Sequence, residues 1–358
     1  MVTSIGRVGE RRDPARPVSV NRVHSMAEMT RLAERRGDDD ARTGPIVSVV
    51  IVSWNTRELL RRCLVSLQQT CALDDVQVIV VDNASSDGSA KLVGETFPWV
   101  ELIANERNVG FGVGNNMALP RVCGEYVLFL NPDTEVRDGA IDALALYLDE
   151  HPEAGIVGTT LLDADGSLQL YCNRFPSAWH SLRHNPLVAR LTNQRAMVCT
   201  QRDREVRSVD WMLGACLMVR WSVLQEVGAF DPRFFVYFEE IDLQYRIRQA
   251  GWDVVYVPSP GVVHLGNQSI GQIGVAASLH QYRGRWLFVR KHYSPASVAA
   301  HLAKTLSGLV AGLIYWGALT ATRLKPRAAD QLRAHWRLLT WHVRGCASPP
   351  APVAAAEA

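Results

Sequence analysis

Three carboxylates stand close together behind an aromatic run in the second half of the sequence. They are Glu239, Glu240 and Asp242, and residues 230–238 before them include five aromatic side chains. Acids at the start of a helix are commonly solvated and favoured by the helix dipole. Aromatic neighbours indicate instead a core region, where an unpaired carboxylate is costly. We therefore expect these three acids to have a function.

A second set of polar residues could hold a hard divalent cation. Asp133 lies in the tripeptide Asn-Pro-Asp, directly after the apolar residues 126–130. Such a tripeptide alone is common in turns. A carboxylate at the end of a buried strand can nevertheless bind Mg²⁺ or Mn²⁺, with water and ligand oxygens completing the coordination. His264 follows a later apolar stretch, and taken alone it is as often structural as a metal ligand.

Three alternating glycines, Gly110, Gly112 and Gly114, invite comparison with a dinucleotide-binding fingerprint. That fingerprint needs its last glycine where Asn115 stands, and it follows the first strand of its fold rather than a later one. A nicotinamide-dependent dehydrogenase is therefore not indicated. The glycines indicate instead a close approach of the backbone to a ligand or a neighbouring helix.

Elements that could position these residues alternate along the first half of the chain. Short β-branched runs predict buried strands, and apolar residues at helical spacing predict the helices between them. We expect strands at 46–53, 76–81, 100–104, 126–130 and 155–160, and helices at 57–70, 86–97, 112–122 and 139–150. Alternation at this spacing predicts an α/β fold with a mostly parallel central sheet and helices on both faces.

The second half is less regular. We expect a buried strand at 209–219, helices at 221–227 and 241–250, and a last strand at 254–257 that ends before His264. Residues 162–207 form a long polar segment that contains Trp179 and several Arg. It has no readable motif, and it is either part of an acceptor pocket or a surface insertion.

Polar loops follow the first four predicted strands. In such sheets ligands bind at the carboxyl ends of the strands, so these loops should carry the chemistry. Two of them place a carboxylate, Asp82 or Asp133, immediately after a buried strand. A single Asp could simply cap a helix, whereas two at one sheet edge indicate a site.

Taken together, five motifs resemble glycosyltransferase family 2, and within it the bacterial rhamnosyltransferase-like branch. They span residues 47–266 in the order of the family, and they leave the N-terminal arm and about the last ninety residues uncovered. The motifs are Ser-Val-Val-Ile-Val-Ser-Trp-Asn at 48–55, Val-Asp-Asn-Ala-Ser-Ser-Asp-Gly-Ser at 81–89, Asn-Val-Gly-Phe-Gly-Val-Gly-Asn-Asn at 108–116, Leu-Asn-Pro-Asp-Thr-Glu at 130–135 and Tyr-Phe-Glu-Glu-Ile-Asp-Leu at 237–243.

The resemblance implies a GT-A fold and an inverting, metal-dependent transfer from a nucleotide-diphospho-sugar. It implies that Asp82 receives the base, and that Asp133 and His264 hold Mg²⁺ or Mn²⁺. Asn131 stands where the metal-binding motif of the family has its first Asp, so a single direct carboxylate contact to the metal is expected.

The resemblance also assigns the proton transfer. Glu240 matches the catalytic base, with Glu239 and Asp242 beside it as supporting acids. On a helix that begins near Ile241, Asp242 should point away from Glu240. Glu239 and Asp242 are then expected to serve the helix start, the other hydroxyls of the acceptor or a neighbouring group such as Arg246. Further residues of the motifs, or near them, are expected to bind the nucleotide sugar or to face the acceptor. The sugar-binding set is Ser53, Asn55, Asp82, Asn83, Asn108, Gly110, Asn115 and Asn131, and the acceptor set is Trp211 and Gly214.

The implied reaction moves L-rhamnose from dTDP-rhamnose to a lipid-linked or cell-envelope polysaccharide acceptor. The alternatives are a family 2 transferase that uses another UDP- or GDP-sugar, and a non-catalytic nucleotide-sugar-binding protein. A sugar-nucleotide pyrophosphorylase is disfavoured, because Trp54-Asn55-Thr56-Arg57 stands where that class has a glycine-rich segment.

The chain divides by composition into four parts. Residues 1–45 are expected to be a disordered arm without a signal peptide, 46–270 the catalytic domain, 271–346 a basic helical region, and 347–358 a disordered tail. From residue 281 onward there are eleven Lys and Arg but two acids. Residues 305–322 carry no charge and predict an apolar helix of about 27 Å that lies on or re-enters an anionic membrane, a core helix being the alternative.

Overall charge and cysteine content set the expected surroundings. Lys and Arg number 38 and Asp and Glu 36, which is too balanced for a nucleic-acid-binding protein. Seven scattered cysteines without a Cys-x-x-Cys pair indicate free thiols in a reducing cytoplasm. We therefore expect a cytoplasmic enzyme, peripheral on the inner face of the plasma membrane, of undetermined oligomeric state.

Overall fold

The structure is a computed structural model that describes residues 46–73, 75–169, 172–176, 205–266, 275–322 and 328–344. The expected arm 1–45, the tail 347–358 and most of the polar segment 162–207, including Trp179, lie outside these residues. The strands are β1 (Val47–Ser53), β2 (Val76–Asp82), β3 (Glu101–Ala104), β4 (Tyr126–Leu130), β5 (Thr134–Val136), β6 (Ala154–Leu162), β7 (Cys172–Asn173), β8 (Arg207–Ser208), β9 (Trp211–Met212), β10 (Cys216–Arg220) and β11 (Asp253–His264). The helices are α2 (Arg57–Thr70), α3 (Ser89–Thr96), α4 (Phe111–Ala118), the 3₁₀ turn η1 (Leu119–Arg121), α5 (Ala140–Glu150), α8 (Trp221–Val227), α9 (Glu239–Gln249), α11 (Val275–His292), α12 (Pro295–Thr322) and α13 (Ala328–Val343).

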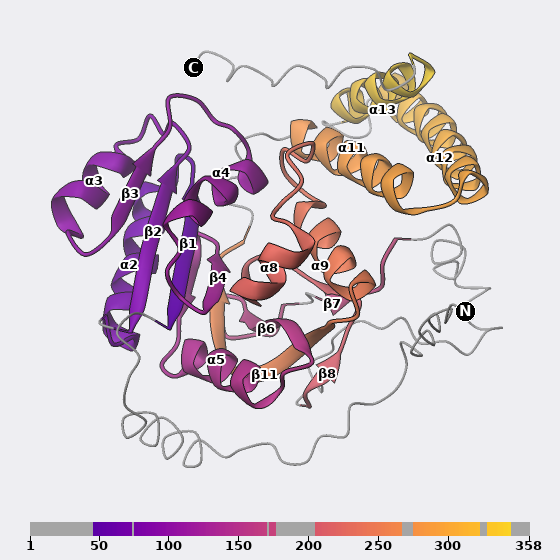
Figure 1. Cartoon of the computed structure of the whole chain (residues 1–358). Coiled ribbons are helices and arrows are strands. Elements are labelled where there is room, and N and C mark those ends of the chain that lie inside the picture. Colours follow the sequence, from indigo (N-terminus) through magenta and orange to yellow (C-terminus); the bar gives the residue numbers. More distant parts are fainter. Residues whose placement is uncertain are drawn as a thin grey trace, which may run out of the picture.

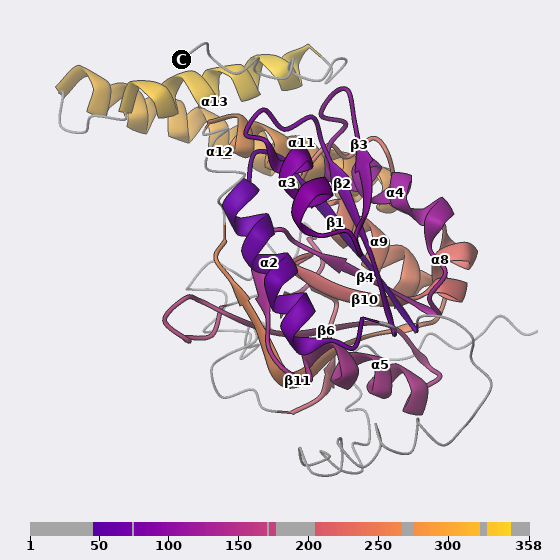
Figure 2. The same ribbon diagram turned by 90° about the vertical axis from the view of Figure 1, so that its left-hand side faces the viewer.

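A central sheet organises the first two thirds of the chain (Figure 1). Its strand order is β3-β2-β1-β4-β10-β6-β11-β5, and β8 pairs with β11. Strands β3, β2, β1 and β4 are parallel neighbours, β10 runs antiparallel between β4 and β6, and β6 is parallel to β11. Helix α2 lies on one face of the sheet, and α4, α8 and α9 cover the other (Figure 2). The expected α/β fold, with a mostly parallel central sheet and helices on both faces, is confirmed.

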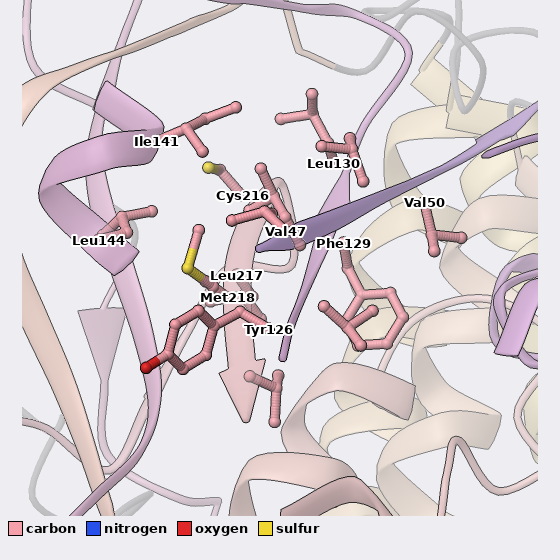
Figure 3. Close-up of a cluster of buried hydrophobic side chains, with 14 of the residues drawn as sticks. Val47, Val50, Tyr126, Phe129, Leu130, Ile141, Leu144, Cys216, Leu217 and Met218 are labelled. Carbon is pink, nitrogen blue, oxygen red and sulfur yellow. The ribbon is translucent and has the colours of Figure 1, made fainter. Parts of the chain in front are cut away.

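The hydrophobic core lies along the middle strands. Residues 49–51 of β1 and 79–81 of β2 are fully buried, because helices cover both faces, and this burial explains their β-branched composition. Figure 3 shows Ile141 and Leu144 of α5 on the side of the sheet where Cys216 and Met218 of β10 lie. The core therefore supports the carboxyl ends of β1, β2 and β4 on a rigid base.

Two predicted strands differ from the structure. The strand expected at 209–219 is divided into β9 and β10 by a turn at residues 213–215, because Gln244 of α9 bonds both the N–H and the carbonyl of Met212 at 2.7 and 2.8 Å. The last strand continues to His264 instead of ending at Val257. A register shift between Val257 and Val262 absorbs two prolines and Gly261, after which β11 pairs with β5.

Three helices follow the sheet domain. Helix α11 lies against α9, and α12 and α13 form a hairpin that packs on the other side of α11 (Figures 1 and 2). The apolar stretch 305–322 is the second part of α12, which is long and apolar enough to cross a membrane. Only 11% of the most apolar stretch of α12 is buried, so α12 is not a core helix of the sheet domain.

The cysteines differ in part from the expectation of free thiols. Cys63, Cys71, Cys123 and Cys216 are free, whereas Cys172 is disulfide-bonded. Disulfide partners are determined by proximity in the fold, which the scattered spacing in the sequence does not reveal.

Candidate active site

Asp82 ends β2 at the sheet edge, with its carboxylate buried. One oxygen, Oδ2, accepts a hydrogen bond from the N–H of Ser85 at 3.0 Å. The other oxygen, Oδ1, is buried and has no hydrogen-bond partner among the described residues. An unpaired buried acceptor is costly, so Oδ1 is suited to a donor group of a ligand.

The loop after β1 is fastened to the loop after β2. Asn55 has a left-handed backbone (φ 51°), its N–H donates to Ser85 Oγ at 2.9 Å, and its Oδ1 accepts from the N–H of Ser86 at 2.8 Å. Ser53 is fully buried, and its hydroxyl contacts that of Thr56 at 2.9 Å. Both side chains thus hold the loops that surround Asp82.

Asn83 joins three loops in the same way. Its Nδ2 donates to the carbonyl of Gly110 at 3.1 Å, and its Oδ1 accepts from Nδ2 of Asn105 at 2.9 Å. Asn108 accepts from the N–H of Gly110 at 2.9 Å. These hydrogen bonds hold the loops at the edge of the site together, and the expected roles of Asn83 and Asn108 toward the sugar stay predictions.

Gly110 begins α4 at a point where only glycine fits. Its φ is +89°, and a Cβ there would stand 2.4 Å from the carbonyl oxygen of Phe235. That carbonyl accepts the N–H of Phe111 at 2.8 Å. Nearby Asn115 is fully buried, with its Nδ2 donating to the carbonyl of Phe111 and its Oδ1 unpaired among the described residues. The glycine-rich motif therefore packs against the segment that leads into α9.

The end of β4 brings together Asn131, Asp133 and His264. Pairing of β5 with β11 sets His264 opposite Thr134, and Nε2 of His264 lies 3.5 Å from both Oδ1 of Asp133 and Nδ2 of Asn131. Both Asp133 and His264 are buried. Three residues that are far apart in the sequence therefore meet at one point of the sheet edge.

A glutamine sets the protonation of His264. Nε2 of Gln169 donates to the carbonyl of His264 at 2.6 Å and to Asp163 at 2.7 Å, which leaves Oε1 as an acceptor 2.8 Å from Nδ1 of His264. The proton therefore stands on Nδ1, and the lone pair of Nε2 faces Asp133. A histidine in this tautomer, beside a buried carboxylate, fits a divalent cation. Among the described residues no group of three or more His, Cys, Asp or Glu could hold a metal, so the protein would supply these two ligands.

Glu239 and Glu240 are buried at the start of α9. Burial raises the pKa of Glu240 to about 7, and burial together with the charge of Glu240 raises that of Glu239 well above its ordinary value. One oxygen of each, Oε2, has no hydrogen-bond partner among the described residues. Burial therefore makes Glu240 a stronger proton acceptor than an exposed carboxylate.

The chain enters α9 through a strained turn. Tyr237 and Phe238 have φ values of 67° and 74°, in the left-handed region that aromatic residues rarely adopt. Consecutive residues of this kind persist where the surrounding packing imposes them, and they are concentrated at functional sites. Here they turn Glu239 and Glu240 into the protein interior.

The turn between β9 and β10 lies directly on Glu240. A Cβ at Gly214 would stand 3.1 Å from Cβ of Glu240, and the neighbouring carbonyl of Ala215 accepts the N–H of Asn131 at 2.9 Å. Gln244 holds this turn to α9 through its bonds to Met212 and to the carbonyl of Glu240. Glu240 and the group around Asp133 are therefore linked through two adjacent residues.

Asp242 does not join this pair. It is fully buried and faces α11, where His292 and Lys291 bond Oδ1 at 2.7 Å, while Arg246 bonds Oδ2 at 2.9 Å. Burial alone would raise the pKa of Asp242, but these three partners lower it. Of the roles left open for this acid, the structure supports the pairing with Arg246. Trp211 is half-buried, and its indole N–H donates to the carbonyl of Arg174 at 2.9 Å.

Four supporting residues had no readable signal in the sequence. Gln169 lies in the polar segment without a motif, Gln244 inside a helix, and Lys291 and His292 in the basic region after the motifs. Each acts through a contact between residues far apart in the chain, which spacing along the sequence does not indicate.

Comparison with known proteins gives consistent matches. The model of the family described as "Glycosyltransferase like family 2" matches residues 44–288. An N-acetylglucosaminyl-diphospho-decaprenol L-rhamnosyltransferase of Mycobacterium tuberculosis is 31% identical over 263 residues, which cover 70% of this chain and 85% of that protein. The rhamnosyltransferase WbbL of Escherichia coli K12 is 25% identical over 61% of this chain and 83% of its own.

A solved structure supports the fold alone. A mannosyltransferase from Pyrobaculum calidifontis, determined with GDP-Man and Mn²⁺, matches with a TM-score of 0.51 at 17% identity. The match covers 89% of this chain and 95% of that one.

Proposed function

Because this chain belongs to glycosyltransferase family 2 and is a glycosyltransferase, we propose that it transfers L-rhamnose from dTDP-rhamnose, with inversion, to a hydroxyl of a lipid-linked cell-envelope acceptor. The rhamnosyltransferase names of the relatives support the sugar. The acceptor class is supported by the name of the mycobacterial relative and by the exposed apolar helix α12.

The observation that carries the proposal is the buried carboxylate of Glu240. With a pKa raised to about 7 and one oxygen unpaired among the described residues, it is suited to take the proton of an acceptor hydroxyl at neutral pH. The contact with Gly214 leaves no side chain between this carboxylate and the backbone of the β9–β10 turn. An acceptor hydroxyl bound beside Glu240 would lose its proton to the carboxylate as its oxygen attacks the anomeric carbon of the sugar, and the bond from that carbon to the nucleoside diphosphate would break.

Asp82 supports a pyrimidine base in the donor. Its Oδ2 is occupied by the N–H of Ser85, so Oδ1 alone is open to a ligand. One open oxygen matches the single imide N–H of thymine or uracil, whereas guanine presents two adjacent donors. Asp82 therefore favours dTDP or UDP over GDP as the carrier.

Asp133 and His264 are the residues that would hold a divalent cation, Mg²⁺ or Mn²⁺. When bound, such a cation neutralises the charge that develops on the departing nucleoside diphosphate. Gln169 keeps the His264 lone pair directed toward Asp133, and Asn131 lies beside both.

The enzyme is proposed to act at the cytoplasmic face of the plasma membrane, to which it binds peripherally. The exposed apolar side chains of α12 and the basic excess of the C-terminal region support this location. A lipid-linked acceptor is itself confined to that surface.

A donor panel tests the proposal. Purified protein with Mn²⁺ is incubated with dTDP-rhamnose, UDP-sugars or GDP-sugars, with and without a polyprenyl-diphospho-sugar acceptor, and release of nucleoside diphosphate is measured. We expect release with dTDP-rhamnose that the acceptor stimulates, and loss of this release in Glu240→Gln. Faster turnover of a UDP- or GDP-sugar would show that dTDP-rhamnose is not the donor. Binding of nucleotide sugars without release of nucleoside diphosphate from any of them would contradict catalysis.

A further inference from the structure

Three helices bring a group of basic side chains together outside the active site. Arg285 of α11, His301 and Lys304 of α12, and His342 of α13 form this group, which we call the cationic cluster. The ring of Trp286 packs edge-on against His342, with 5.4 Å between the centroids. His301 and Trp286 are only 5% and 8% exposed, while Lys304 is exposed, so the cluster reaches from the helix interface to the surface.

Several polar atoms of this interface have no hydrogen-bond partner among the described residues. They are Nε of Arg285, Nε1 of Trp286 and Nδ1 of His301, all buried. Two of them are N–H donors whatever the pH, and the third becomes one when His301 is protonated. Buried donors without acceptors are costly. A ligand with acceptor oxygens could bond these atoms, for which the described part of the chain supplies no acceptor.

Among the described residues, no acid offsets the charges of Arg285 and Lys304. Burial and the charges of Arg285, Lys304 and His342 lower the pKa of His301 to about 4. Burial and Arg285 lower the pKa of Lys304. No acid contributes to either shift, and Asp330 of the neighbouring helix is paired with Arg333. Cations gathered in a partly buried place without a counter-ion are stabilised by an anion that binds there.

We propose that the cationic cluster is a binding site for the phosphate group of a membrane lipid. Arginine and lysine side chains with free N–H groups are the usual ligands of phosphate oxygens. Lys304 directly precedes the uncharged stretch 305–322, on which Val310, Ile314 and Tyr315 are exposed. A phosphate held by the cluster therefore lies at the end of an apolar surface along which the hydrocarbon chain of the same lipid can lie.

Two lipids carry this chemistry at a membrane surface: an anionic phospholipid, through its phosphodiester, and a polyprenyl-linked acceptor, through its diphosphate. The second source rests on the proposed function, whereas the site itself does not. Binding can be measured without donor sugar or turnover, so a failure of the site and a failure of the transferase proposal are distinguishable.

The experiment uses the full chain and three probes. They are vesicles of phosphatidylcholine with phosphatidylglycerol, vesicles of phosphatidylcholine with a polyprenyl diphosphate, and vesicles of phosphatidylcholine alone. Arg285→Gln and Lys304→Gln each remove one charge of the cluster, and Arg333→Gln removes one charge from the same hairpin outside it. All variants are first checked for wild-type thermal unfolding.

We expect each cluster variant to bind phosphate-bearing vesicles about tenfold more weakly than the wild type, as for loss of one charged hydrogen bond, and Arg333→Gln to stay within about twofold. If the cluster variants bind both kinds of anionic vesicle more weakly, the site recognises lipid phosphate in general. If only binding to the polyprenyl diphosphate vesicles is weakened, the site recognises the acceptor. Equal effects of Arg285→Gln, Lys304→Gln and Arg333→Gln would overturn the site in favour of diffuse surface charge.

Proton uptake gives a second measurement. The charges of Arg285 on α11, Lys304 on α12 and His342 on α13 face His301 and oppose its protonation. A bound phosphate carries negative charge and therefore favours the protonated form of His301. Affinity for phosphatidylglycerol, whose phosphodiester does not titrate near neutrality, should therefore rise as pH falls from about 8 to about 5.5. His301→Gln should flatten this dependence, and an unchanged slope in that variant would contradict a site built around His301.

Discussion

Glu240 is the residue on which the proposed chemistry depends. Replacing it by Gln keeps its shape but removes its basicity, so kcat should fall by at least about 10²-fold, as is typical for loss of a general base. Binding of the nucleoside diphosphate, measured by calorimetry, should be retained. The matched control is Glu239→Gln, which removes a buried carboxylate one residue away. If Glu240→Gln transfers sugar at nearly the wild-type rate and Glu239→Gln does not, then Glu239 rather than Glu240 is the base.

The pH dependence of kcat follows from the same burial. A base must be ionised, and the raised pKa of Glu240 means that half of it is protonated at about pH 7. With saturating substrates, kcat should therefore rise as pH increases through about 7 and then level off. A profile that is flat between about pH 5.5 and pH 8 would exclude Glu240 as the titrating base.

The same shift affects stability with a definite sign. The pKa of Glu240 in the folded protein lies above the ordinary value of 4.5 for a Glu side chain. Its contribution to stability is therefore fully present below about pH 4.5 and is lost as pH rises through about 7. Burial of this carboxylate is thus tolerated at working pH at a cost in stability, as is common at catalytic sites.

Metal affinity should depend on the proposed ligand Asp133 and also on Gln169, which holds His264 but does not touch the metal. Asp133→Ala removes the proposed carboxylate ligand and should abolish stimulation by Mn²⁺. Because Asp133 is buried, thermal unfolding without Mn²⁺ shows whether the variant keeps its fold. Gln169→Leu should weaken Mn²⁺ binding by about 10- to 100-fold by releasing the His264 tautomer. Mn²⁺ titration monitored by thermal shift measures both, with exposed Asp165→Ala as control. An undiminished Mn²⁺ response in Asp133→Ala would refute the metal site.

At the scale of elements, an ion cluster links α11 to α9, beside an apolar cluster that includes Ile241 and Phe288. Lys291 bonds Asp231 and Asp242 at 2.7 Å each, and His292 and Arg246 complete the shell of Asp242. Because the pKa of Asp242 is lowered in the folded state, the stability it contributes is present at neutral pH and is lost only as pH falls through that lowered value.

Lys291→Met should therefore destabilise the protein by about 2 kcal/mol, the order of magnitude for a lost charge-assisted hydrogen bond with its partner left buried. Chemical denaturation at neutral pH measures this loss. Lys91→Met removes an exposed lysine whose partner Glu95 is 3.8 Å away, and it should change stability little. Equal small effects of the two substitutions would show that α11 is held by apolar packing alone.

The elements themselves were largely predictable. β4, α2 and α8 have the expected bounds because their apolar patterns are clear from the sequence. The division of residues 209–219 was not predictable, since it depends on Gln244 from a helix that follows in the chain. The extension of β11 to His264 was missed for a similar reason: two prolines mask a strand whose continuation depends on pairing with β5.

The site was predictable to the level of motifs. The positions of Asp82, Asp133 and Glu240 relative to the strands and α9 follow from the topology of a parallel sheet. The supporting roles of Asn55 and Asn83 were not separable from ligand binding, because the same amide can serve either purpose. Their roles toward the sugar, like those of Trp211 and Gly214 toward the acceptor, remain predictions.

At the scale of the whole molecule, the hairpin of α12 and α13 should determine where the enzyme acts. Ile314 is 71% exposed, so Ile314→Asp should leave the fold intact but weaken binding to anionic vesicles, because a carboxylate resists burial in lipid. Vesicle flotation measures this binding, and Ala321→Asp, at an exposed small residue near the end of α12, controls for the added charge. Full retention of Ile314→Asp on vesicles would exclude this face as the membrane contact.

The position of α11 between the catalytic helix and the hairpin has a consequence for acceptor length. One side of α11 contacts the turn before Glu239, at Gly284, and the other contacts α13 through Trp286. Only one helix layer, about 10 Å thick, thus separates the turn into α9 from the hairpin. An enzyme docked by that hairpin reaches saccharide hydroxyls close to the lipid and not those at the end of a long glycan. On the proposed lipid-linked acceptor, we therefore expect the enzyme to act early in the growth of the oligosaccharide.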